Sequence, residues 1–225
     1  MLSFLVSRRE VYARDSIEFS RVTAIVDNGA VSAFTLLIVN IIVRRANAQS
    51  DATFAEAFAG HLNDLLAYAV TFVLVAVAWR AQHRLTSTLS AMDSAFIRAT
   101  LAWVFVAVLA PMAGVMLWDF WGDPLAMGYY WAWMAVLWCA ECLASTIAHR
   151  HGLVQPVIDD EIYGSGWRIR GSAIRALLFA VAGVVAWLTT SLAAALVVVL
   201  GLTALWIRRW RLRRRWASDA IDTEA

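Results

Sequence analysis

Polar side chains interrupt an apolar stretch near the start of the chain, from Arg21 to Ile42. They include Asp27, Asn28, Ser32, Thr35 and Asn40. At ~1.5 Å rise per residue, a helix of this length covers about 33 Å, enough to cross the hydrocarbon core of a membrane. A carboxylate that faced lipid there would cost several kcal/mol, so Asp27 is expected to face protein or water. The chemistry open to such residues is charge compensation or ion passage within a membrane.

Side chains three or four residues apart share one face of a helix, so Ser32, Leu36 and Val39 form a stripe bordered by Asn28 and Thr35. Such a stripe could line a narrow pathway in which apolar constrictions gate by dewetting and hydroxyls assist ions. Spacing alone favours another interpretation. In it, Ser32 and Thr35 bond back to carbonyls of the preceding turn, and Leu36 and Val39 pack against neighbouring helices.

The charged residues of this stretch need partners elsewhere, because Arg21 and Asp27 are six positions apart and are not neighbours on a helix. Trp79 and His83, four apart at the end of the next apolar stretch, lie at the same expected membrane depth. A network of these four residues would compensate the charges, and we expect it to be structural.

Other candidate residues are few. Glu141, in a later apolar stretch, could serve proton or cation passage in a transporter, or bond to a neighbouring helix. Cys139 and Cys142 are expected to pack as small apolar side chains. The sequence shows no nucleophile with its base, no phosphate loop, no metal-ligand cluster and no mid-membrane His pair for haem. We therefore expect no catalytic residue, metal or cofactor.

Composition sets the class. The chain has 225 residues, of which 61% are hydrophobic and 16% charged, which indicates an integral membrane protein of the all-α class. We expect a lead-in at residues 1–20, a six-helix transmembrane domain at 21–207 and an Arg-rich, then acidic tail at 208–225. The expected spans are about Arg21–Ile42, Leu62–Trp79, Ser94–Trp118 with a kink at Pro111, Leu125–Ala148, Ser172–Leu188 and Leu192–Ile207.

The arginines predict the orientation. All nineteen basic residues are Arg, and six spans place seventeen of them on the side of the two termini, leaving Arg44 and Arg45 on the other. Basic residues concentrate on the cytoplasmic side of membrane proteins, so both termini, including an amphipathic lead-in, are expected in the cytoplasm. The small net charge of +2 suits anchoring at lipid headgroups, and no nucleic-acid partner is expected.

The first two spans resemble those of the transmembrane-protein-175 family, potassium channels of prokaryotes and endolysosomes. The family's first helix begins RxxxFSDG and runs to a TLL triplet. Here Arg21 and Asp27 match the motif, and Thr35, Leu36 and Leu37 form the triplet. Its second span ends in W-x-x-H-H, whose first and last members are Trp79 and His83.

This chain also departs from the family pattern. Its Ile25, Val26 and Asn28 replace the Phe, Ser and Gly of the first motif, and Ser32 stands where the family has a large aliphatic constriction. Gln82 occupies the position of the first His and Thr100 that of an Asn in the third span; Pro111 matches that span's Pro.

The resemblance implies a homotetramer whose first helix lines the pore, without a filter of backbone carbonyls. The predicted function is a potassium-permeable channel, not an enzyme, in a prokaryotic inner membrane, with potassium ions and membrane lipids as partners. The pore would be lined by Ser32, Thr35, Leu36 and Val39. Two alternatives stay open: a proton-coupled transporter that uses Asp27 and Glu141, and a membrane scaffold whose Arg208–Arg215 segment holds anionic lipid or a partner.

Overall fold

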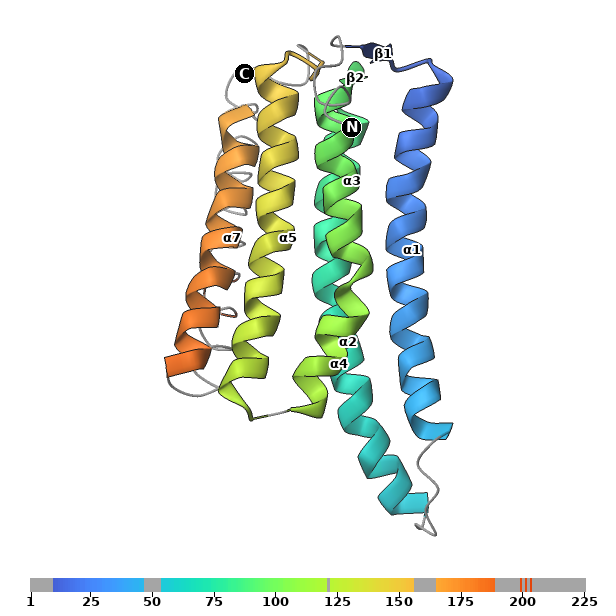
Figure 1. Ribbon diagram of the computed structural model, residues 1–225, viewed down its shortest axis with the longest axis vertical. Helices are drawn as coiled ribbons and strands as arrows, with labels where there is room; N and C mark the ends of the chain where they lie inside the picture. Colours follow the sequence, from blue (N-terminus) through green and yellow to red (C-terminus); the bar gives the residue numbers. More distant parts are fainter. Residues whose placement is uncertain are drawn as a thin grey trace, which may run out of the picture.

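The computed structural model describes residues 10–46, 54–120, 122–155 and 165–188, together with residues 199, 201 and 203. Its helices are α1 (Ile17–Ala46), α2 (Phe54–Ser87), α3 (Ser94–Val108), α4 (Ala110–Asp119), α5 (Pro124–Arg150) and α7 (Ser165–Leu188). They run side by side as one bundle, with α1 and α7 on opposite flanks and α2 and α3 between α1 and α5 (Figure 1). Two short strands, β1 (Val11–Ala13) and β2 (Ala91–Asp93), lie at one end of the bundle.

Four stretches of the described residues are long and apolar enough to cross a membrane. They are Ile17–Val39, Ser94–Asp119, Pro124–Arg150 and Ile169–Leu188. A mostly helical membrane protein is what the composition predicted. The sixth expected span, about Leu192–Ile207, lies almost entirely outside the described residues. The count of six spans, the cytoplasmic termini and the division at residues 20 and 207 therefore stay predictions.

Several helices begin earlier than the apolar stretches do. α1 begins at Ile17, because the Ser16 hydroxyl oxygen accepts a hydrogen bond from the Phe19 N–H at 3.2 Å and so caps the first turn. α2 begins at Phe54, before the expected span that starts at about Leu62, and α7 begins at Ser165, before the expected span that starts at about Ser172. Hydropathy marks only the apolar part of a helix, whereas its polar end turns extend beyond that part.

The third expected span is broken where Pro111 predicted a kink. α3 ends at Val108 and α4 begins at Ala110, with Pro111 as one of its first two residues. Proline has no N–H and cannot continue the helical hydrogen bonds of the preceding turn. The Leu109 N–H turns to the Val106 carbonyl at 3.2 Å, which closes α3 before the break.

The strands were not predicted from the sequence. β1 pairs with β2 in antiparallel register, with Val11 opposite Asp93 and Ala13 opposite Ala91. Where an amphipathic lead-in was expected, three residues of extended chain thus join the connection between α2 and α3. A strand of three residues has too little alternation for periodicity to reveal it.

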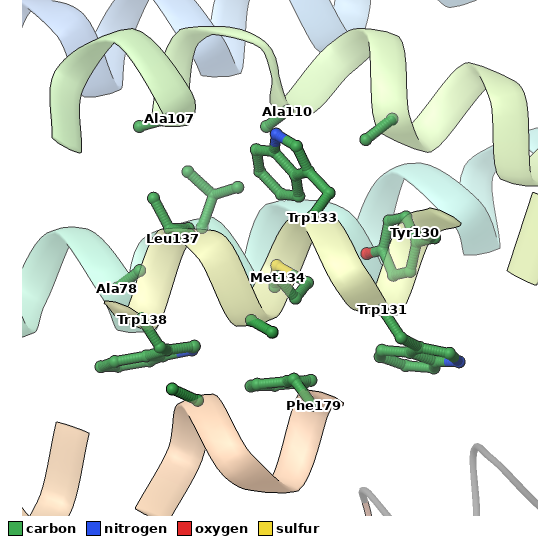
Figure 2. Packing of buried hydrophobic residues seen from close by; sticks show 14 of the residues in the cluster. Ala78, Ala107, Ala110, Tyr130, Trp131, Trp133, Met134, Leu137, Trp138 and Phe179 are labelled. Atoms are coloured by element: carbon green, nitrogen blue, oxygen red, sulfur yellow. The ribbon is translucent and has the colours of Figure 1, made fainter. Parts of the chain in front are cut away.

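The larger cluster of buried apolar side chains contains residues of α5 and of the helices around it (Figure 2). The ring of Trp131 on α5 stacks on Phe179 of α7, with centroids 5.8 Å apart, while Trp133 points toward Ala110 of α4. At Gly183 of α7 the two backbones come close enough that an added Cβ would lie 3.4 Å from the carbonyl oxygen of Gly128. Close approach at small residues is how helices pack in membranes, where water supplies no driving force.

Candidate functional site

One face of α1 is left uncovered by the rest of the chain. The buried face carries Phe19, Val22, Val26, Ala30, Ala33 and Leu37. An exposed stripe with spacings of three and four residues carries Arg21, Ile25, Asn28, Ser32, Leu36 and Val39. The two sets lie on different sides of the helix because residues three and four apart share a face. α1 thus packs with one side and presents the other, part polar and part aliphatic.

The predicted pore residues all lie on the uncovered side of α1. Leu36 is 43% exposed and Val39 is 41% exposed, and Ser32 and Thr35 are exposed as well. The Thr35 hydroxyl donates to the Val31 carbonyl at 2.9 Å, as the packing interpretation expected. That interpretation also expected Leu36 and Val39 to be packed, and in the single chain they are not.

Asp27 joins α1 to α2. Its Oδ1 atom accepts a hydrogen bond from Trp79 Nε1 at 3.0 Å and lies 3.3 Å from His83 Nδ1. The rings of Trp79 and His83 lie 5.4 Å apart, so the two partners also pack on each other. The carboxylate and the imidazole are 40% and 48% exposed, which leaves the pair in reach of solvent or headgroups. These contacts fix the rotation of α1 about its axis relative to α2.

Arg21 stands apart from this group. It lies in the second turn of α1 on the exposed stripe, whereas Asp27 turns toward α2. Among the described residues, Arg21 makes no hydrogen bond or ion pair with Asp27, Trp79 or His83. The structure therefore brings together three of the four residues of the predicted network.

A second polar contact, between α2 and α3, was not foreseen. Gln82 Nε2 donates to the Thr100 hydroxyl at 3.3 Å, and both side chains are fully buried. These positions depart from the family pattern, at its first His and at its third-span Asn. Each was noticed separately in the sequence. The sequence signal for this contact was a polar residue at each of the two departing positions. Only the fold shows that the two side chains touch.

Glu141 and the cysteines lie away from the exposed stripe of α1. Glu141 on α5 is 3% exposed. On α7 the guanidinium carbon of Arg175 lies 4.4 Å from the centre of the Trp138 ring of α5. The Cys142 thiol faces the Ile169 carbonyl at 3.8 Å, whereas Cys139 is exposed. Within the described ranges, no group of three His, Cys, Asp or Glu side chains could hold a metal ion.

Comparison with known proteins gives a match to a family model and a similarity to solved structures. Residues 21–111, which include most of α1, all of α2 and α3 and the start of α4, match the family model described as endosomal/lysosomal potassium channel TMEM175. Among solved structures, the chain is similar to a lysosomal potassium-selective channel TMEM175 homolog from Chamaesiphon minutus. The sequences are 18% identical, the TM-score is 0.59, and the match covers 84% of this chain and 96% of that one. No curated protein sequence matches the chain.

The two matches agree with each other and with the motifs of the first two spans. The family is one of ion channels and not of enzymes. The bundle built around α1 has the fold of the solved homologue. Residues 21–111 carry the sequence signature of the TMEM175 potassium-channel family, and the resemblance of the chain to that family is confirmed.

Proposed function

We propose that the protein is a potassium-permeable cation channel, a homotetramer in which four copies of α1 surround the pore. The observation that carries this proposal is the uncovered stripe of α1. It holds Arg21, Asn28 and Ser32 beside aliphatic residues. Polar side chains facing lipid are costly, whereas the same side chains around a wet axis are not. The family match and the fold of the solved homologue support the assignment.

The constriction in this pore is formed by Leu36 and Val39. Rings of aliphatic side chains around a narrow path expel water and so block hydrated ions until the path widens. Ser32, at the family's constriction position, forms a wetter ring, so the barrier lies at Leu36 and beyond. The Thr35 hydroxyl, although it donates to Val31, keeps acceptor lone pairs for a passing cation.

Two polar contacts position α1, one directly and one through the helices α2 and α3 behind it. Asp27, bonded to Trp79 and His83, sets the rotation of α1, and the buried pair of Gln82 and Thr100 holds α2 against α3 behind it. The arginine distribution supports cytoplasmic termini with anionic headgroups around the basic ends. The similarity to a TMEM175 homolog from Chamaesiphon minutus supports a prokaryotic inner membrane as the location.

Potassium flux from liposomes that contain the purified protein tests the pore assignment. Replacing Leu36→Asn wets the constriction and is expected to raise potassium flux by about threefold or more. Ile38→Asn is the matched control, since Ile38 is 47% exposed on the same turn of α1 but lies off the stripe. If the wild type passes no potassium, or if the two variants behave alike, the pore assignment is wrong.

The same liposomes separate a channel from the two alternatives. A proton-coupled transporter that used Asp27 and Glu141 would show uptake driven by a pH gradient, and Glu141→Gln would abolish that coupling. A passive channel keeps its flux in Glu141→Gln. A scaffold would show no flux at all and would depend on Arg208–Arg215, a segment outside the described residues.

A further inference from the structure

One end of the bundle is closed by a layer of extended chain, which we call the collar and define as residues 11–14, 88–93 and 153–155 (upper end of Figure 1). The connection between α2 and α3 is its middle segment. On one side β2 pairs with β1, and the Arg14 N–H donates to the Ser90 carbonyl at 3.0 Å. On the other side Leu89 forms an antiparallel β-bridge with Val154, and the Ser90 N–H donates to the Leu153 carbonyl at 2.8 Å.

Asp93 is the residue at which the collar meets the helices. Its Oδ1 atom accepts the Phe96 N–H at 2.8 Å and so caps α3, and its Oδ2 atom is hydrogen-bonded to His151 Nδ1. His151 is the residue that caps the carboxyl end of α5. Asp93 is fully buried, and a buried carboxylate is tolerated only when its oxygens are paired. One side chain thus ties the start of α3 to the end of α5.

The collar is also tied to the start of α1, with little slack. Only residues 14–16 separate β1 from α1, and across them the Ser16 N–H donates to the carbonyl of Ala13 in β1 at 3.0 Å. Beneath the collar, Phe19 and Val22 of α1 are buried in one apolar cluster with Ala144 and Ala148 of α5. A shift at the end of α5 therefore reaches the first turns of α1 through both backbone and packing.

We propose that His151 is a positioning residue for the pore, acting through Asp93 and the β1–β2 pair on the first turns of α1. This role rests on the proposed function of α1 as the pore helix. Because α1 continues without a break from the collar to Leu36 and Val39, the position of its first turns sets how closely four such helices approach at the constriction.

Single-channel recording from the full-length protein in planar bilayers tests this role. His151→Leu removes the donor to Asp93 and is expected to change open probability by about fivefold or more, the lower range of coupling between distant sites. His151→Asn places an amide N–H near the position of Nδ1 and is expected to restore open probability to within about twofold of the wild type. Unitary conductance stays as in the wild type, because the pore-lining side chains are unchanged.

A second pair of variants interrupts the same connection without touching His151. Arg14→Pro removes the N–H that donates to Ser90, whereas Arg14→Ala keeps it. Arg14→Pro is expected to reproduce the effect of His151→Leu, and Arg14→Ala to behave as the wild type. This pair decides the question if His151→Leu does not fold. All variants are compared after gel filtration at equal amounts of assembled protein.

The outcomes separate the two proposals. A conducting wild type with unaltered open probability in both Arg14→Pro and His151→Leu overturns the positioning role and leaves the pore intact. Failure of His151→Asn to restore gating, with folded and assembled protein, also overturns it. A wild type that passes no potassium overturns the proposed function, and the positioning role with it.

Discussion

At the scale of single residues, the contacts of Asp27 support the proposal that this acid is a structural group. Its Oδ1 atom is shared by an indole N–H at 3.0 Å and an imidazole nitrogen at 3.3 Å. The hydrogen bond from Trp79 to the Asp27 carboxylate is partly buried. The contact of Asp27 with His83 is about half exposed, so solvent screens it. A charge-assisted hydrogen bond contributes about 1.5–3 kcal/mol and an exposed ion pair about 0–1 kcal/mol.

The two partners of Asp27 are therefore expected to differ in their contribution to stability. Trp79→Phe should lower the free energy of unfolding by about 1–2 kcal/mol, and His83→Ala by less than about 1 kcal/mol. Unfolding in mild detergent, followed by tryptophan fluorescence or circular dichroism, measures both. Combining each variant with Asp27→Ala should abolish most of its effect. A larger loss in His83→Ala than in Trp79→Phe would contradict this ranking.

At the scale of elements, α1 is held against α3 by close packing at Gly29. A Cβ built on Gly29 would lie 2.7 Å from Cγ1 of Val104, closer than real side chains approach. Val104 is β-branched and has little freedom to turn away. The contact between α1 and α3 therefore depends on the missing side chain at this position.

Gly29→Ala is expected to destabilise the protein by about 1–3 kcal/mol, the usual cost of overpacking, in spite of the better helix propensity of alanine. Val104→Ala added to Gly29→Ala should recover part of this loss. The matched control is Gly128→Ala on α5, where the nearest atom to an added Cβ is 3.5 Å away, an ordinary contact. Thermal unfolding in detergent compares them. Equal melting temperatures for Gly29→Ala and Gly128→Ala would show that α1 and α3 are not closely packed there.

At the scale of the whole molecule, the exposed stripe of α1 is a face that the single chain leaves uncovered. A symmetric assembly is the common way for a soluble or membrane protein to cover such a face, and the proposed tetramer places it on the axis. Every residue of the stripe then meets its own copies. Ser32, which replaces the family's aliphatic residue, lies at the centre of that arrangement.

Cross-linking tests this arrangement in a chain whose Cys139 and Cys142 have been replaced by Ala. Ser32→Cys should form disulfide-linked dimers rapidly on oxidation, because the four copies face one another. Ala33→Cys should not, because Ala33 is fully buried against the other helices of its own chain. Native mass in mild detergent should be about 100 kDa, four times the 24.9 kDa of one chain, plus detergent. A monomeric mass, or equal cross-linking of both variants, would refute the pore axis.

Many of the helices and some of the site residues could be predicted from local patterns in the sequence. Apolar stretches located α1, the α3–α4 stretch, α5 and α7, since a span must satisfy its backbone hydrogen bonds as a helix. Pro111 marked the break because a missing N–H acts locally. The motif residues of the first two spans predicted the resemblance to the family whose model matches residues 21–111. Asp27, Trp79 and His83 were grouped from their expected membrane depth.

The tertiary structure decided what depends on partners far away in the chain. It left Arg21 out of the group that Asp27 forms with Trp79 and His83, because the rotation of α1 is set by its contacts with α2 and α3. It joined Gln82 to Thr100, and Asp93 to His151, because hydrogen bonds between distant segments leave no periodic trace in a sequence. It also showed which side of α1 stays uncovered. Local patterns specify helices, whereas the rotation and pairing of those helices come from packing that only the assembled fold contains.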